Sequence, residues 1–341
     1  MADRESTFAN PEVIKLLNER FVAVAADDWY ERRRDDAVGK FFVGVAIQGP
    51  RRGEGGSTRQ GIYCFTASGK LLAFRNHRDP GVMLDEFRRA LDKFAKLPSD
   101  EREPGAVKVP PLDDATLDRQ FTRKPPEGAI AVRVFARVLE RDEHGNCTAC
   151  TAGEGESRRG LLSSLDHLWI TADEWRSLIP REAKAGDKIA IPAALAERIA
   201  RFHLVDNTRG EPPMWRREDV RKNALSLTVV EATPNTLKLR LDGEVLLSTT
   251  PDVPKSDKIA KNERGYDARL LGYIDIDRRK PAVARFDVVA LGDHWGEGTY
   301  TRGARPGKTP FGIAFQLADG KHAADVVPPQ ASRDWGGYLR P

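Results

Sequence analysis

The sequence is short of several residue types, and each shortage excludes a class of protein. Its 341 residues include only 3 cysteines, 3 methionines and 8% aromatic residues. So few cysteines cannot build the disulfide framework that stabilises many small secreted domains. No apolar run reaches the ~20 residues that a membrane-spanning helix needs, and Met1–Ser6 lacks an apolar signal-peptide core. The sequence therefore predicts a cytoplasmic protein without a membrane span, unless a signal peptide has been removed.

A strong excess of one charge sign is also missing. Lysine and arginine number 55, aspartate and glutamate 51, and the net charge is +4. Dedicated nucleic-acid binders concentrate an excess of basic residues, so this balance argues against nucleic acid as a partner. A content of 40% hydrophobic and 31% charged residues is typical of a globular protein. The length predicts about two domains of ~150 residues each.

The N-terminal third predicts a helix, a strand, a second helix, a hairpin and a closing helix. Apolar residues spaced along 10–18 indicate the first helix, and the run Phe21–Ala26 indicates a buried strand. Two further strands, 61–66 and 71–74, flank a turn at Ser68-Gly69, and the pattern at 82–94 is that of an amphipathic helix.

This order of elements resembles the thioredoxin-like family over residues 8–96. The phrases Pro11-Glu-Val-Ile-Lys-Leu-Leu-Asn-Glu-Arg-Phe-Val22 and Thr66-Ala-Ser-Gly-Lys70 are similar to its bacterial branch. The whole chain resembles uncharacterised bacterial proteins described as thioredoxin-domain-containing. The resemblance implies a central sheet flanked by helices.

The chain departs from that family at the redox centre. The family has a Trp-Cys-x-x-Cys motif at a helix start, where the helix N-terminus lowers the pKa of the first thiol. This chain has Trp29-Tyr-Glu-Arg-Arg-Arg34 at that point, and Arg59-Gln-Gly-Ile62 where the family has its cis-proline. The resemblance thus implies the scaffold, with a degenerate active site.

The rest of the chain predicts a linker and a larger β-rich domain. Prolines disfavour helix at 98–128, so we expect domains at 1–97 and 129–341 joined by an extended linker at 98–128. Thr171 begins a capping-box pattern for a helix ending at Leu178, and 192–203 predicts a second helix. The predicted fold class is mixed α and β (α+β or α/β), with an antiparallel sandwich or curved sheet in the second domain. The expected strands are 129–139, 167–170, 225–230, 237–242, 243–248, 266–276, 284–290 and 311–317.

Two cysteines form the only C-x-x-C motif, Cys147-Thr-Ala-Cys150, in a loop that also holds His144. The spacing suits a disulfide or a shared metal. The loop lacks a helix start that would activate a thiol, and one further ligand would be needed for a closed zinc site. An incidental pair at a loop tip is the alternative.

Arginines and aromatic residues supply the candidate ligand-binding positions. The glycine-rich loop 48–61 carries Arg51, Arg52 and Arg59, and we expect it beside Trp29 and Arg32, where guanidinium groups could hold an anion or carboxylate. A solvated, flexible loop is the alternative.

A second candidate site combines two polar-aromatic clusters. One is the expected turn Asp293–Glu297 with His294 and Trp295; the other runs from His203 through Asp206 and Arg209 to Trp215. Histidines beside acids could ligate a metal or exchange protons. Turn residues that satisfy their own backbone explain each cluster equally well.

Three functional hypotheses follow from these patterns. The first is a non-catalytic binding protein, with an unknown protein or a small anionic ligand as partner and no cofactor. The second is a thiol-disulfide oxidoreductase that uses Cys147 and Cys150. The third is a hydrolytic or metal-dependent enzyme built around His294 and His203. The sequence favours the first because the thioredoxin-like scaffold lacks its thiols.

Overall fold

A computed structural model of the chain describes residues 7–53, 57–109, 111–121, 123–151, 163–251, 259, 263–322, 325 and 327–340. These residues combine large antiparallel sheet with a smaller share of helix. They divide into two compact units, an N-terminal unit up to Lys124 and a β-rich unit from Pro125 onward. No helix in the described ranges is long and apolar enough to cross a bilayer.

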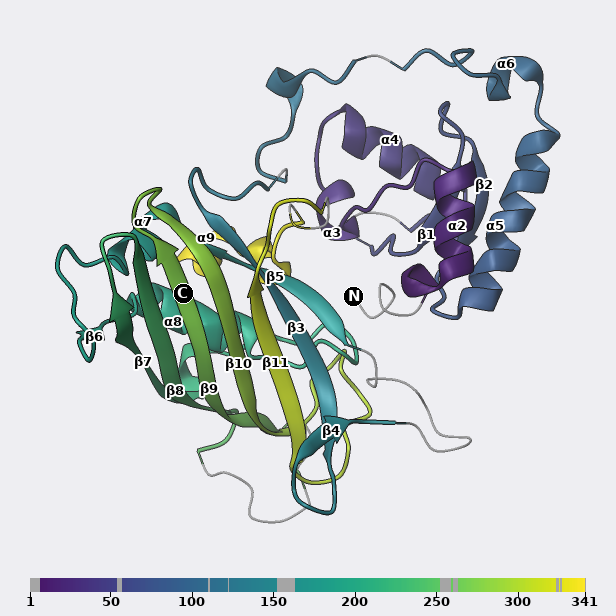
Figure 1. Cartoon of the computed structure of the whole chain (residues 1–341). Helices are drawn as coiled ribbons and strands as arrows, with labels where there is room; N and C mark the ends of the chain where they lie inside the picture. The colour runs from purple at the N-terminus through teal and green to yellow at the C-terminus, as the bar shows by residue number, and fades with distance from the viewer. Residues whose placement is uncertain are drawn as a thin grey trace. The chain divides into compact units, whose positions relative to one another are not determined.

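The N-terminal unit is a small α/β assembly around one hairpin (Figure 1). Strands β1 and β2 pair antiparallel, and the long helix α5 begins at Pro80, where the side chain of Asp79 accepts a hydrogen bond from the N–H of Val82. The expected hairpin and closing helix are therefore present. Bounds in this unit are η1 Thr7–Ala9, α2 Pro11–Arg20, α3 Asp28–Glu31, α4 Ala37–Ala46, β1 Ile62–Phe65, β2 Leu71–Arg75, α5 Pro80–Ala95, α6 Ser99–Arg102 and η2 Asp114–Thr116.

The core of this unit is small and joins α2, the hairpin and α5. Met83 and Phe87 on α5 are almost fully buried, and Phe87 contacts Phe21 with ring centroids 5.8 Å apart. The buried members are Val13, Cys64, Leu72, Ala73, Met83, Leu84, Phe87 and Ala90. Cys64 is one of these core residues, and burial raises the pKa of its thiol to about 12.

One element of the N-terminal prediction is wrong. Residues 21–27 form no strand, and Val22 and Val24 are 94% and 78% exposed. In the described part of the unit, β1 pairs only with β2, so no neighbouring strand hydrogen-bonds to this segment. An apolar run needs such a partner to become a strand, and the sequence pattern alone did not reveal that this run has no partner strand among the described residues.

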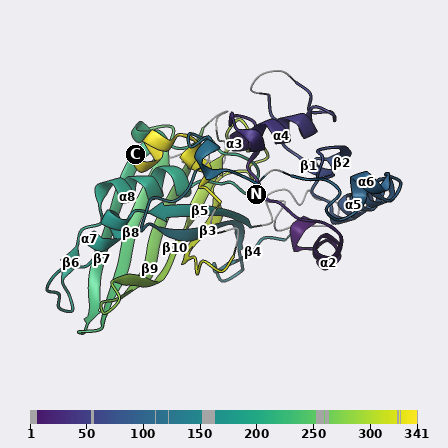
Figure 2. The same ribbon diagram turned by 90° about the horizontal axis from the view of Figure 1, so that it is seen from above.

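The β-rich unit is built on a nine-stranded antiparallel sheet in the order β4-β3-β11-β10-β9-β8-β7-β6, with β5 paired to β3. Figures 1 and 2 show the long strands β7 to β11 side by side, with α8 over one face. The strand bounds are β3 Ile130–Arg141, β4 Cys147–Ala149, β5 Ser164–Ile170, β6 Lys188–Ile189, β7 Val220–Ala232, β8 Thr236–Ser248, β9 Arg264–Asp277, β10 Ala282–Gly296 and β11 Thr309–Leu317.

Alternation of apolar and polar residues explains the strands. On β8, Leu237, Leu239 and Leu241 are buried, while Lys238 and Arg240 between them face outward. The inward side chains of β3 and β7 to β11 join the helical residues Leu195 and Ile199 in one large core. Of the two architectures expected for this half, the single sheet with helices on one face is the one observed.

Helices in this unit are short. Thr171 caps α7 and forms the predicted capping box with Glu174. The predicted helix 192–203 is α8, continued by a π-helical turn, η3. Their bounds, with those of the remaining elements, are α7 Ala172–Ser177, α8 Ala193–Arg198, η3 Ile199–His203, η4 Arg217–Asp219, η6 Gln330–Arg333 and α9 Trp335–Leu339.

Three boundaries differ from the prediction for a common reason. The expected strands 237–242 and 243–248 are the single strand β8, the expected turn at 293–296 is the end of β10, and Cys147 starts the short strand β4. In each case polar or glycine residues interrupt the apolar pattern, but pairing with a neighbouring strand continues through them. Ladder hydrogen bonds do not depend on side-chain type, so the strand runs on.

Candidate functional site

The short helix α3 positions an aromatic side chain at the surface of the N-terminal unit. Asp27 caps it, accepting a hydrogen bond from the N–H of Trp29 at 2.8 Å. The indole of Trp29 lies edge-on to Tyr30, with ring centroids 5.0 Å apart. The guanidinium of Arg33 stacks 4.4 Å from the indole centroid. We call residues 27–36, which carry this group and lead to α4, the Trp29 turn.

Asp36 closes the Trp29 turn and starts the next helix. Its Oδ1 accepts hydrogen bonds from the N–H groups of Val38 and Gly39, as an N-cap does. Its Oδ2 lies 2.8 Å from Nη2 of Arg34, and both side chains are almost completely buried. Gly39 is needed for this approach, because a Cβ there would lie 2.2 Å from the carbonyl oxygen of Arg34.

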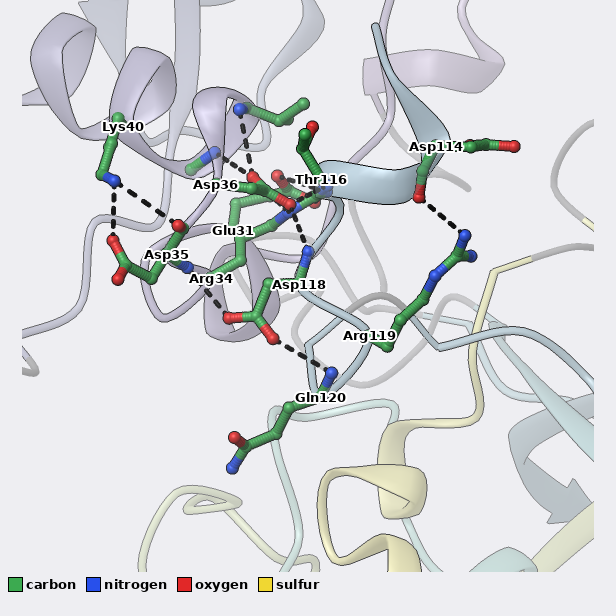
Figure 3. A network of polar contacts seen from close by, with 12 residues as sticks. Glu31, Arg34, Asp35, Asp36, Lys40, Asp114, Thr116, Asp118, Arg119 and Gln120 are labelled. Atoms are coloured by element: carbon green, nitrogen blue, oxygen red, sulfur yellow. Dashed lines mark hydrogen bonds and ion pairs between the residues drawn. The ribbon is translucent and has the colours of Figure 1, made fainter.

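A segment distant in sequence docks on the Trp29 turn (Figure 3). The N–H of Asp118 donates to Oδ2 of Asp36 at 2.9 Å, and Oδ2 of Asp118 accepts from the N–H of Asp35 at 2.9 Å. Phe121 then packs on Trp29, with ring centroids 5.7 Å apart. We call residues 113–121 the strap. The expected linker 98–128 therefore differs from an extended run: it contains α6 and η2 and folds back on its own unit.

The electrostatics of this contact favour an ionised Asp36. Burial by itself raises the pKa of its carboxyl group, but hydrogen bonds from Arg34 and from the N–H groups of Asp118 and Gly39 outweigh burial. The pKa of Asp36 is therefore held well below its usual range. Burial raises the pKa of the neighbouring Glu31, and the Arg34 guanidinium only partly offsets it. Arg34 thus stabilises Asp36 more than Glu31.

The arginine-bearing loop does lie beside the Trp29 turn. Asp28 of α3 accepts hydrogen bonds from the hydroxyl of Thr58 at 3.0 Å and from the N–H of Arg59 at 3.1 Å, and it pairs with Arg32. The charge of Asp28 acts with burial to raise the pKa of Tyr63 to about 12.

Two arginines of this loop donate to backbone carbonyl oxygens, and the third lies beside an aromatic ring. Arg59 donates to the carbonyl oxygens of Arg51 and Gly53, and Arg52 donates to that of Gly49. The ring of Phe74 lies 5.9 Å from the guanidinium of Arg51. These contacts fold the loop on itself, so an anion would compete with existing hydrogen bonds. The residues of this loop at 54–56 lie outside the described residues.

The two cysteines of the C-x-x-C motif have separate surroundings. Both carry reduced thiol groups. Cys147 is on β4, with Nη1 of Arg141 3.9 Å from its sulfur, whereas the thiol of buried Cys150 donates to Oε1 of Glu140 at 2.9 Å. Side chains three residues apart on an extended chain point to opposite faces, which a helical C-x-x-C avoids. His144 pairs with Glu143 at the surface. In the described ranges, no three His, Cys, Asp or Glu side chains are grouped to hold a metal ion.

The two polar-aromatic clusters of the β-rich unit do come together. Asp206 accepts from the N–H and hydroxyl of Thr208 and from Nε of Arg209 at 2.6 Å. Arg209 also donates to the carbonyl oxygens of Gly296, the last residue of β10, and of Thr301 in the loop that follows. The charges of Arg209 and His294 outweigh burial and lower the pKa of Asp206.

The aromatic residues of these clusters are part of the packing. Trp215 is buried, donates from Nε1 to the carbonyl oxygen of Leu204 at 2.8 Å, and lies 3.9 Å below the guanidinium of Arg264. Trp295 is buried against Gly265, whose Cβ would lie 2.0 Å from the indole. Burial and the nearby arginines lower the pKa of His294 although Asp206 opposes them. The sequence left open whether the two clusters meet. The structure brings Arg209 to the end of β10, and both tryptophans are buried.

His203 is held in a different network that sequence reasoning missed. Its Nε2 lies 2.9 Å from the hydroxyl of Tyr338, which also accepts from the N–H of Trp169, and its Nδ1 lies 3.7 Å from Asp166. Burial, with the charge of Arg198, lowers the pKa of His203 to about 3, so the imidazole is neutral at pH 7. No motif in the sequence links position 203 to the C-terminal Tyr338.

The sequence also gave no signal for the strap. Asp118 and Phe121 sit in a segment whose prolines and acids predict a solvated linker, and only Asp36, three residues before Gly39, has a recognisable capping position. In comparisons with known proteins, the chain matches no family model, no curated protein and no solved structure. The chemistry that the geometry offers at the Trp29 turn is recognition of a peptide segment.

Proposed function

We propose that this chain is a non-catalytic interaction protein whose N-terminal unit keeps a thioredoxin-like scaffold without its redox centre. The observation that carries the proposal is the seating of the strap on the Trp29 turn. There, Trp29, Asp35 and Asp36 engage the turn at 118–121 through aromatic packing and exchanged hydrogen bonds. A surface that holds a segment of its own chain in this way has the groups needed to hold a peptide.

The thiols support the same proposal. The described residues of the Trp29 turn include no cysteine, and Cys64 of the same unit is a buried core residue. Cys147 and Cys150 belong to the β-rich unit, where an extended backbone separates their side chains. A dithiol catalyst needs two sulfurs within bonding reach and a thiol of lowered pKa.

Reduction of insulin in the presence of dithiothreitol tests the proposal. The full chain should give the rate of dithiothreitol alone, and the double variant Cys147→Ser/Cys150→Ser should match it. A rate above the dithiothreitol control that disappears in the double variant would establish the oxidoreductase and remove the proposal.

A further inference from the structure

The strap presents three features to the Trp29 turn, and each meets a different group. The N–H of Asp118 meets the carboxylate of Asp36, and the carboxylate of Asp118 meets the N–H of Asp35. The ring of Phe121 meets the indole of Trp29. An aspartate and an aromatic residue three positions later therefore account for the contacts between the two segments.

The residues between these two positions set the spacing without touching the turn. The N–H of Gln120 donates to Oδ1 of Asp118 at 3.0 Å, and the N–H of Phe121 donates to the carbonyl oxygen of Asp118 at 3.1 Å. Arg119 donates back within the strap to the carbonyl oxygen of Asp114. The side chains of Arg119 and Gln120 are exposed. A different pair of residues in these places would leave the contact intact.

The strap is attached weakly enough to be displaced. Residues 103–106 and 111–116 around it are exposed, and Asp118 and Phe121 are only half-buried. An intramolecular segment on a short tether acts like a ligand at an effective concentration of roughly millimolar. A stronger external segment can replace it, while a weak one cannot.

We propose that the Trp29 turn is a docking site for a turn-forming segment of another protein that carries an aspartate followed three residues later by an aromatic residue. The strap is the intramolecular competitor that occupies the site until such a partner arrives. This inference rests on the proposed function, because it assigns a partner class to the same surface.

Hydrogen exchange of the wild-type chain tests the site without any substitution. The probe is a synthetic peptide with the sequence of residues 111–121, added in excess. The amide of Asp118 in the protein should exchange faster because its acceptor is taken by the peptide. The amide of Asp35 should stay slow because the aspartate of the peptide replaces that of the strap. Unchanged exchange at both amides with saturating peptide would overturn the proposal.

Variants of the full chain separate the site from its occupant. Asp118→Ala/Phe121→Ala removes both side-chain contacts of the strap and leaves only the backbone N–H at position 118. This emptied variant should bind the labelled peptide at least ~10-fold more tightly than the wild type does. Arg119→Ala/Gln120→Ala is the matched control and should bind as weakly as the wild type. Adding Trp29→Ala to the emptied variant should abolish binding. Equal binding by the emptied variant and the control, in folded protein, would overturn the proposal.

Two further outcomes are informative about the partner. Peptides in which the aspartate or the aromatic residue is alanine should lose binding, while substitution of the two intervening residues should not. A wild-type dimer that becomes monomeric when the strap is emptied would overturn an external partner, since the strap would then join two copies. The insulin assay is independent: thiol-dependent activity would end the proposed function, whereas loss of peptide binding alone would end only this inference.

Discussion

The N-terminal unit and the β-rich unit each hold a buried aspartate paired with an arginine, Asp36 with Arg34 and Asp206 with Arg209. In both, backbone N–H groups complete the carboxylate, and its pKa is lowered despite burial. The difference lies in what covers the pair. The strap contributes the N–H of Asp118 to Asp36, whereas the carbonyl oxygens of Gly296, the last residue of a paired strand, and of Thr301 in the loop that follows hold Arg209.

The two aspartate–arginine pairs should differ in how easily they open. Local opening costs little where few apolar contacts are lost and the backbone is exposed, and most where a sheet core must separate. The Asp36 carboxylate can therefore lose its Asp118 partner without unfolding of the N-terminal unit. The Asp206–Arg209 pair can be exposed only when the packing at the end of β10 is disrupted. One pair suits exchange of a bound segment, and the other suits stability.

The largest expected loss of stability comes from removing Arg209 from its pair with Asp206. Arg209→Met leaves Asp206 buried without its guanidinium, which costs about 3–5 kcal/mol. The free energy of unfolding, measured by urea denaturation of the full chain, should fall by that amount. Arg269→Met is the matched control, because Arg269 on the same sheet is 86% exposed, and it should change the value by less than about 0.5 kcal/mol. Equal effects would contradict the described burial of Arg209.

The stabilities of the two units should next differ in their response to acid. The pKa of His203 is lowered to about 3 in the folded chain and is about 6.5 when unfolded. Because the unfolded state binds the proton first, the stability that the neutral imidazole contributes is complete above pH ~6.5 and is lost as pH falls towards 3. His203 should contribute a slope of about 1.4 kcal/mol per pH unit in this window, and His294, whose pKa burial also lowers, should add to it.

The N-terminal unit should respond only at lower pH. The pKa of Asp36 is lowered on folding, so the stability from its ionised form is present above the unfolded value of about 4 and is lost below it. The protection factors of β8 and β9 amides, which correct for the slower intrinsic exchange at lower pH, should decrease between pH 6 and 5, while those of α4 amides should not. His203→Gln should lessen the first response, and His144→Gln, at an exposed position, should leave it unchanged. Parallel responses of the two units would refute the assignment.

A smaller loss of stability is expected when the pair of Asp36 with Arg34 is broken. Asp36→Ala removes the cap of α4 and leaves Arg34 without one of its carboxylate partners, which costs about 2–4 kcal/mol. Asp36→Asn keeps an N-cap acceptor and should cost less. The emission of Trp29 should change in both variants, because Phe121 loses its anchor. Hydrogen exchange of α4 amides at increasing urea concentrations measures the loss in free energy of unfolding. A free energy equal to that of the wild type would show that the cap contributes nothing.

Substitution of the half-buried cysteine, Cys147, should have the smallest effect on stability. Cys147 is half-buried, whereas Cys150 and Cys64 are buried, so an alkylating reagent should modify Cys147 first. Burial holds the pKa of Cys64 at about 12, which leaves almost no thiolate at pH 8. Cys147→Ser should change the free energy of unfolding by less than about 0.5 kcal/mol. Mass spectrometry of partly alkylated protein reports the order, and faster reaction at Cys64 would contradict the core position.

Secondary structure was predictable where local chemistry was sufficient. Local sequence patterns predict the element directly at the capping box of Thr171, at the turn between β7 and β8 near Asn235 and along the alternating residues of β8. The run Phe21–Ala26 is apolar throughout and is not a strand, since pairing depends on a partner elsewhere in the chain. The thioredoxin-like scaffold stays a prediction for the N-terminal unit.

For the candidate sites, too, local features were predictable and contacts with distant residues were not. The sequence placed the arginine loop beside the Trp29 turn, where the structure has it, and left open whether the clusters around Arg209 and His294 meet, as they do in the structure. It did not show that the arginines are bonded to carbonyl oxygens or that the tryptophans are buried. Candidate residues chosen for their chemistry became structural because burial and hydrogen bonding are set by neighbours far along the chain.

By itself, the amino-acid sequence determined the absence of a Cys-x-x-Cys motif after Trp29, the helix caps and the faces of the long strands. These depend on residue type and on spacings of a few positions. Tertiary structure alone decided that the strap returns to the Trp29 turn and that His203 meets Tyr338. Such contacts join residues 82 and 135 positions apart. Their formation depends on the packing of the elements between them, which no local pattern encodes.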